Sequence, residues 1–216
     1  IEGIGTPTLT IFGGPLLSGK NKIYQTIPDR IEAGSFVILG ALCGKDIKIN
    51  RCVPGHIESL IQKLQEAGVD VQVGKDWIRV TDGGRKKILP FDIKTHEYPG
   101  FATDVQAPMA VLLTQADGES FIFETIWENR LNYLETLSFM GAKVKILDSH
   151  QAIIYGPTPL RGREMESPDL RAGLAYLLAA IVAEGQSIVH NAYYIDRGYE
   201  NIEGRLSQLG VDIRRV

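Results

Sequence analysis

The stretch SPDLRAGLAYLLAAIVAEG at residues 167–185 decides the fold, because two other stretches repeat its plan: IPDRIEAGSFVILGALCG at 27–44 and TDVQAPMAVLLTQADG at 103–118. Each stretch has an Asp near its start, then a strongly apolar run, then a Gly. Asp is a preferred residue at a helix start, and Gly easily adopts the left-handed conformation that ends a helix. The sequence therefore predicts three helices that are apolar on all sides, as helices inside a core are.

The chain after each apolar helix also has one plan. A short alternating strand is expected first, then an amphipathic helix with apolar residues three and four positions apart, then a second strand. The first strands are expected at 46–50, 120–124 and 187–191. The amphipathic helices are expected at 57–64, 131–140 and 202–209, ending at Gly68, Gly141 and Gly210. The second strands are expected at 69–73, 142–146 and 211–213, with further strands at 77–80 and 152–155 in the first two copies.

This threefold pattern predicts one α/β domain over residues 1–216. Its three repeated modules are expected at about 21–95, 96–160 and 161–216, with the apolar helices inside and the sheets around them. The chain begins without Met, in residues that read as a strand running into a turn, which suggests a fragment of a longer protein.

The composition excludes several classes of protein. With 44% hydrophobic and 23% charged residues, the 216-residue chain is typical of a globular protein. A net charge of -3 gives no reason to expect nucleic acid or an anionic membrane as a partner. The longest apolar run, 175–183, is about half of what a membrane-spanning helix needs.

Neither a disulfide framework nor a metal site is expected. Cys43 and Cys52 do not form a metal-binding spacing, and the four His are scattered, so we predict a reducing, cytoplasmic setting and no metal. GPLLSGKN at 14–21 is close to the phosphate-binding P-loop pattern, but Asn21 replaces the Ser or Thr of that pattern and Pro28 interrupts the segment in which a helix should begin. A plain loop is the better interpretation.

Charged residues gather at the predicted helix starts. Arg30 and Arg171 lie in first turns, where a cation opposes the helix dipole, so each calls for an anionic neighbour. Helix starts with several Arg suit a phosphate or carboxylate. We therefore predict an anion clamp of Arg130, Arg171 and Arg197, with Asp104 close enough to act as a base. The alternative is that each Asp is only a helix cap and each Arg only a surface ion pair.

The charged turns resemble those of the enolpyruvyl transferase family, and the resemblance covers the whole chain. The matching stretches are IPDRIEAGSF (27–36), EYPGFATDVQAP (97–108), ETIWENR (124–130), SPDLRAGLAYLLAAIVAEG (167–185) and YIDRGYENIEGRLSQLG (194–210). The Asp-Arg-Gly-Tyr-Glu and Glu-Asn-Arg runs are similar to the cell-wall branch of the family, which uses UDP-N-acetylglucosamine.

The resemblance implies a two-domain enzyme of the inside-out α/β barrel type, with three repeats in each domain and the active site between the domains. It implies transfer of the enolpyruvyl group of phosphoenolpyruvate to the 3-hydroxyl of UDP-N-acetylglucosamine, with release of phosphate, in peptidoglycan synthesis. No cofactor is implied.

The resemblance also assigns roles by position. It implies two catalytic residues: Asp104, the general base, and Asp169, the acid paired with the region that holds phosphoenolpyruvate. The implied substrate-binding residues are Asp29, Glu32, Thr103, Ile126, Trp127, Arg130, Arg171 and Arg197. Among these, Arg171 and Arg197 would hold phosphoenolpyruvate, Arg130, Thr103 and the 126–127 backbone would lie at the sugar, and Asp29 and Glu32 would line the cleft. Ala102, Trp127 and Leu131 depart from the family, which has Pro, Phe and Phe there.

The family's other domain, with its Lys-Asn pair and its Cys or Asp loop, has no counterpart in residues 1–216. We therefore expect this chain to be the C-terminal domain of the pair and to lack turnover by itself. Two alternatives stay open. One is a stand-alone module that binds an anion or nucleotide sugar without chemistry, and the other is the related synthase of the shikimate pathway.

Overall fold

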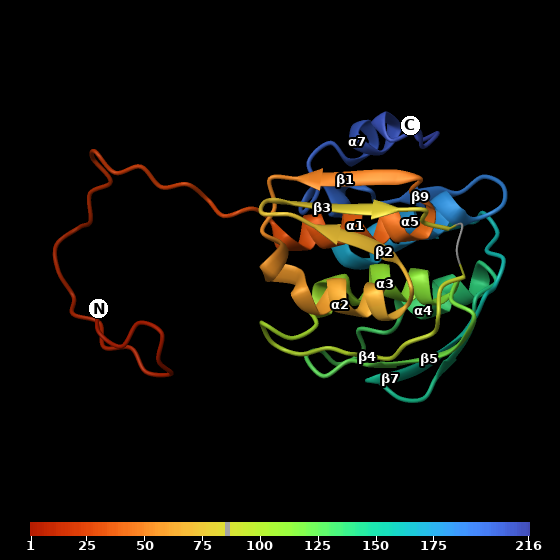
Figure 1. Ribbon diagram of the computed structural model, residues 1–216, viewed down its shortest axis with the longest axis horizontal. Helices are drawn as coiled ribbons and strands as arrows, with labels where there is room; N and C mark the ends of the chain where they lie inside the picture. The colour runs from red at the N-terminus through yellow and green to blue at the C-terminus, as the bar shows by residue number, and fades with distance from the viewer. Residues whose placement is uncertain (85–86) are drawn as a thin grey trace.

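The computed structural model describes residues 1–84 and 87–216, in which a body of helices and sheets carries the first residues as an extended arm (Figure 1). Residues 1–28 are exposed throughout, and a single β-bridge within them joins Glu2 to Thr10. The strand expected at the chain start is reduced to that bridge. Residues 14–21 contain a bend at Pro15 and a turn at 20–21 but no helix or strand, so the prediction of a plain loop is confirmed.

The first module has the predicted order of elements. It contains α1 (Arg30–Cys43), β1 (Asp46–Asn50), the 3-10 helix η1 (Pro54–Ile57), α2 (Glu58–Glu66), β2 (Asp70–Val73) and β3 (Trp77–Thr81). The strands pair antiparallel in the order β1-β3-β2, with Val80 opposite both Ile47 and Val71. Alternation along β3 directs Ile78 and Val80 into the core.

The second sheet contains four strands, and its first strand, β4, lies just before the boundary expected at about residue 96. The elements of the second module, with β4 included, are β4 (Ile93–Lys94), the 3-10 helix η2 (Thr103–Val105), α3 (Gln106–Leu113), β5 (Gly118–Phe123), α4 (Tyr133–Phe139), β6 (Lys143–Ile146) and β7 (Gln151–Gly156). The sheet order is β4-β5-β7-β6, in which only the β4–β5 pair is parallel.

The third module contains β8 (Glu164–Glu166), α5 (Leu170–Val182), β9 (Ile188–His190), α6 (Tyr193–Asp196) and α7 (Ile202–Gln208). Its sheet consists of the parallel pair β8-β9. The strand predicted at 211–213 is wrong, because these residues have no neighbouring strand to pair with in the described chain, and a strand needs a partner for its backbone groups.

The three apolar helices α1, α3 and α5 lie together in the interior, as predicted, and Figure 1 shows them between the sheet of the first module and the sheet of the second. Every residue of α3 is buried. Gly40 permits the close approach of α1 to β3, because a Cβ there would lie 3.0 Å from Val80 Cβ. The fold is therefore mixed α/β, with a helical core covered by three sheets. In the described part of the chain, no helix has the length and apolarity needed to cross a membrane.

The predicted ends of the apolar helices need correction. Gly44 follows α1 with a φ of −76°, so it is not a left-handed cap. The other two helices end at Leu113 and Val182, several residues before Gly118 and Gly185. The glycines after the amphipathic helices, at 68, 141 and 210, do have positive φ, which confirms their predicted role.

Candidate active site

Two of the three repeated Asp residues are helix caps, as the sequence predicts. Asp29 Oδ1 accepts hydrogen bonds from the N–H groups of Ile31 (2.7 Å) and Glu32 (3.1 Å) at the start of α1. Asp169 Oδ1 does the same at α5, accepting from Arg171 N–H (2.7 Å) and Ala172 N–H (3.0 Å). These bonds satisfy backbone donors that a helix start leaves free.

Asp104 is not a cap, contrary to the prediction from the repeat. It lies inside η2, and α3 begins two residues later at Gln106 with no side-chain cap. Pro108 gives the physical reason. With Asp104 as cap, Pro108 would stand where the first internal N–H bond forms, whereas a start at Gln106 places it among the positions whose N–H groups are unbonded in any case.

The Asp104 carboxylate instead faces two arginines from other elements. Its Oδ1 accepts from Arg171 Nε, in the first turn of α5, at 3.0 Å and lies 3.4 Å from Arg130 Nη2, in the turn before α4. All three side chains are more than half buried, which limits screening by water. Two guanidinium groups against one carboxylate leave this cluster with a net positive charge, suited to an anionic ligand.

Tyr199 holds Arg171 on the side away from Asp104 through a hydrogen bond from a second nitrogen of the guanidinium group. Arg171 Nη1 donates to the Tyr199 hydroxyl at 3.4 Å, and that hydroxyl lies 2.9 Å from Ser35 Oγ in α1. Burial raises the pKa of Tyr199, so the phenol stays protonated at neutral pH. The sequence patterns did not predict a role for Tyr199. A phenol beside an Arg in a charged turn was the available signal.

Arg197 makes no hydrogen bond or ion pair with Asp104 in the described structure. It directly follows α6, is exposed, and its side chain makes no hydrogen bond or ion pair among residues 1–84 and 87–216. It lies two residues before Tyr199, on the same turn that contacts Arg171. Its place in the predicted anion clamp therefore stays a prediction.

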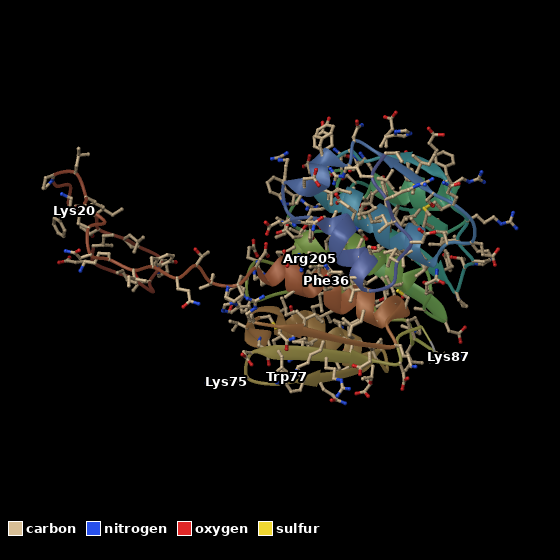
Figure 2. All side chains as sticks on the ribbon, turned by 90° about the horizontal axis from the view of Figure 1, so that it is seen from above. Lys20, Phe36, Lys75, Trp77, Lys87 and Arg205 are labelled. Carbon is tan, nitrogen blue, oxygen red and sulfur yellow. The ribbon has the colours of Figure 1, made fainter. Side chains whose placement is uncertain are left out.

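Glu32 and Arg30, at the start of α1, have partners from outside the first module. Glu32 forms an ion pair with Arg205 of α7, at 2.7 Å, and the Arg205 guanidinium lies 4.5 Å from the centre of the Phe36 ring, where Figure 2 shows the two side chains side by side. Arg30 lies over the ring of Tyr98 at 5.3 Å. Arg30 therefore finds an aromatic face in place of the anionic neighbour that was expected.

Three of the predicted sugar-lining positions meet at a residue that the sequence patterns did not reveal. Thr103 Oγ1 donates to Glu124 Oε2 at 2.8 Å, and the N–H groups of Ile126 and Trp127 donate to Glu124 Oε1 at 2.9 and 3.2 Å. Glu124 is fully buried. The sequence did offer one signal for Glu124: it is an acidic residue that directly follows the strand β5.

No group of His, Cys, Asp and Glu suited to a metal ion occurs in the portion of the chain that the structure covers. The cluster of Asp104, Arg130 and Arg171 can accept a proton from a neighbouring hydroxyl through its carboxylate and can balance negative charge through its two cations.

Comparison with known proteins places these features in a family. The model of the EPSP synthase (3-phosphoshikimate 1-carboxyvinyltransferase) family matches residues 1–206. The UDP-N-acetylglucosamine 1-carboxyvinyltransferase of Koribacter versatilis is 47% identical over 216 residues, which are 100% of this chain and 49% of that protein. The corresponding protein of Solibacter usitatus is 45% identical over 217 residues, covering 100% of this chain and 51% of that protein. The chain spans about half the length of the curated relatives it matches.

Solved structures agree with this assignment. The enolpyruvyl transferase NikO from Streptomyces tendae has a TM-score of 0.79 and 29% sequence identity, over 87% of this chain and 44% of that one. EPSP synthase from Acinetobacter baumannii has a TM-score of 0.60 at 17% identity, over 76% of this chain and 40% of that one, which is a likeness of fold alone.

Proposed function

Because the chain belongs to the EPSP synthase family of carboxyvinyl transferases, we propose that it is one domain of an enzyme that transfers the enolpyruvyl group of phosphoenolpyruvate to the 3-hydroxyl of UDP-N-acetylglucosamine. The observation that carries the proposal is the contact of the Asp104 carboxylate with Arg171 and Arg130. The relatives at 43–47% identity over the whole chain, which are named for this nucleotide sugar, support the choice of acceptor.

The proposed chemistry uses each charge of this cluster. Asp104 takes the proton of the sugar 3-hydroxyl, which makes the oxygen a better nucleophile, as that oxygen adds to C2 of phosphoenolpyruvate and the electron pair of the C2=C3 double bond takes up a proton at C3. Loss of a proton from C3 and of phosphate from C2 then restores the double bond in the enolpyruvyl product. Arg171 and Arg197 balance the charges of the carboxylate and of the departing phosphate, and Arg130 lies at the sugar. Asp169 caps α5 through Oδ1, so a catalytic role for it would use its other oxygen.

The remaining substrate positions belong to the same proposal. Thr103 and the backbone of Ile126 and Trp127 line the sugar, and Asp29 and Glu32 lie at the edge of the cleft. The cleft itself would form against a second domain, with both domains of the inside-out α/β barrel type, in a cytoplasmic enzyme of peptidoglycan synthesis without a cofactor. The partners are thus phosphoenolpyruvate, UDP-N-acetylglucosamine and the other domain of the same protein.

The shikimate-pathway synthase is the competing activity, since the family model bears its name. The relatives named for the nucleotide sugar are 43–47% identical to the chain, whereas the solved synthase from Acinetobacter baumannii is 17% identical. This difference favours the nucleotide sugar as acceptor.

An acceptor comparison tests the proposal. The full-length protein is given phosphoenolpyruvate with either UDP-N-acetylglucosamine or shikimate 3-phosphate, and phosphate release and product mass are measured. We expect release only with the nucleotide sugar, and Asp104→Asn should lower kcat by about 100- to 10,000-fold, the usual contribution of a general base. Turnover with shikimate 3-phosphate, or an Asp104→Asn variant of normal kcat, would refute the assignment.

A further inference from the structure

Glu124, at the end of β5, has an unusual number of hydrogen bonds for a single side chain. Its exposed fraction is 0%. Besides the donors from Thr103, Ile126 and Trp127, its Oε1 accepts from Thr95 Oγ1 at 2.9 Å, so four donors point at its two oxygens. A carboxylate in the interior is costly unless such bonds replace its water, and these four bonds do so.

These bonds join two turns that are far apart in the sequence. Oε2 holds Thr103, the residue directly before Asp104, while Oε1 holds the N–H groups of the 126–127 turn. The Asp104 turn and the 126–127 turn are therefore fixed relative to each other through one side chain. His150 Nδ1 lies 2.8 Å from the carbonyl oxygen of Glu124 and holds its backbone as well.

The direction of each bond decides what the two turns can offer a ligand. The hydroxyl hydrogen of Thr103 and the amide hydrogens of Ile126 and Trp127 are all donated to Glu124, so none of them is available to a ligand. Thr103 Oγ1 and the carbonyl oxygens of Ile126 and Trp127 accept no hydrogen bond from the described residues, so their lone pairs stay free. Free acceptors of this kind suit a ligand that presents O–H or N–H groups, and Thr103 directly precedes Asp104 in the chain.

We propose that Glu124 is a positioning residue that orients the Thr103 hydroxyl and the 126–127 turn so that the surface beside Asp104 accepts hydrogen bonds from the hydroxyl and amide groups of the sugar. The proposal rests on the proposed function and adds to it the residue that selects the acceptor substrate. Glu124 itself makes all its described contacts within the protein.

Glu124→Gln tests the direction of the bonds with little change of shape. The amide oxygen can keep the three bonds at the Oε1 position, and the NH2 group then donates to Thr103 Oγ1. Thr103 must turn its hydrogen away from residue 124, toward the site. The variant is expected to fold and to present a donor where the wild type presents an acceptor, and a mismatch of this kind weakens binding of a ligand donor strongly.

The measurement is steady-state kinetics of the full-length protein. Glu124→Gln is expected to raise the KM for UDP-N-acetylglucosamine by roughly 10- to 100-fold, the scale of a misplaced binding group, while the KM for phosphoenolpyruvate changes several-fold less. Thr103→Val, which removes the hydroxyl, should give a similar split between the two KM values. Thr103→Ser restores the hydroxyl and should recover most of the loss.

Thr158→Val is the matched control. Thr158 is buried, whereas Thr103 is half-buried, and the Thr158 hydroxyl donates to the Thr114 carbonyl oxygen at 3.2 Å, just after the end of α3, whereas Thr103 lies before the start of that helix. The control therefore removes one hydrogen bond of a side chain of the same type and should leave both KM values unchanged. The double variant Thr103→Val/Glu124→Gln should be close to its worse single variant, because residues that act through each other are not additive.

Each possible result of these measurements either supports or overturns the role proposed for Glu124. Equal effects of Glu124→Gln and Thr158→Val, or multiplicative losses in the double variant, would overturn the proposal. If Glu124→Gln does not fold, the comparison of Thr103→Val with Thr103→Ser decides, and equal KM values for the nucleotide sugar would overturn it. A wild-type protein without activity toward UDP-N-acetylglucosamine would instead refute the proposed function, which keeps the two failures apart.

Discussion

Arg171 connects the candidate site to the interior of the molecule. Its Nε donates to Asp104 and its Nη1 donates to Tyr199, whose hydroxyl meets Ser35 of α1. A planar guanidinium can direct separate N–H groups at two partners in fixed directions, whereas an ammonium group is a single point charge. The side chain therefore holds the Asp104 carboxylate and is itself held.

The variant Arg171→Lys is predicted to show how much of the role of Arg171 depends on its two directed hydrogen bonds and how much on its positive charge. The variant keeps the positive charge but loses one of the two bonds, so we expect kcat/KM for phosphoenolpyruvate to fall about 100-fold, as for a misplaced catalytic group. The unfolding temperature should stay within a few degrees of the wild type, because the Lys ammonium keeps a positive charge opposite Asp104 and leaves no carboxylate unpaired. Steady-state kinetics and a thermal melt of the full-length protein measure both, and unchanged kinetics would contradict the role of Arg171.

Asp29 supports a stability prediction at the same scale. Asp29→Ala removes two cap bonds from α1 and should lower the free energy of unfolding by about 1 kcal/mol, whereas Asp29→Asn keeps an oxygen acceptor and should cost only a few tenths. Urea denaturation of the two variants measures the difference. Equal stability of both variants would show that the cap is unimportant.

At the scale of elements, the repeat predicted the type of most helices and strands, but it did not predict β4, β8 or α6. Alternation identified β1, and apolar spacing of three and four identified α2, α4 and α7, since burial of one face imposes these periods. The three buried helices were identified by uniformly apolar runs instead. The failures lie where a neighbour decides. Residues 211–213 have a strand-like pattern but no adjacent strand in the described chain, and the α3 start is set by Pro108, which outweighs the preference of Asp104 for a cap.

Gly173 tests how closely α5 packs. A Cβ at this position would collide with Ser167 Oγ and would lie 2.8 Å from Cγ1 of the fully buried Ile195 in α6. Ala would favour the helix by about 1 kcal/mol, but overpacking costs typically about 1–3 kcal/mol, so Gly173→Ala should destabilise the fold. Gly204→Ala is the control.

At Gly204 in α7 the atoms near an added Cβ belong to the exposed side chain of Asn201, which is free to move. That variant should be neutral or slightly stabilising. Thermal melts of the two variants give the comparison, and a Gly173→Ala protein as stable as Gly204→Ala would contradict the packing of α5 against α6.

At the scale of the whole molecule, the candidate site could be predicted only in part. The sequence correctly brought together Asp104, Arg130 and Arg171, because equivalent ends of repeated modules point to one region. It did not reveal Glu124 or Tyr199, since their roles come from hydrogen bonds between segments that are 21 to 164 residues apart. Such long-range partners leave no periodic signal in a single sequence.

The chain by itself is predicted to be inactive. It covers about half of the length of its curated relatives, and in the proposed function the cleft forms only against a second domain. Residues 1–216 alone should release no phosphate from phosphoenolpyruvate and UDP-N-acetylglucosamine, whereas the full-length protein should. Comparable rates for the two proteins would mean that residues 1–216 hold all the groups that the reaction needs.

A crystal structure of the full-length protein with UDP-N-acetylglucosamine and an unreactive analogue of phosphoenolpyruvate tests the central claim most directly. The account predicts the sugar 3-hydroxyl within hydrogen-bonding distance of the Asp104 carboxylate, about 2.6–3.2 Å, and the phosphate group of the analogue against the Arg171 guanidinium. A sugar bound elsewhere, with Asp104 and Arg171 still paired only to each other, would contradict it.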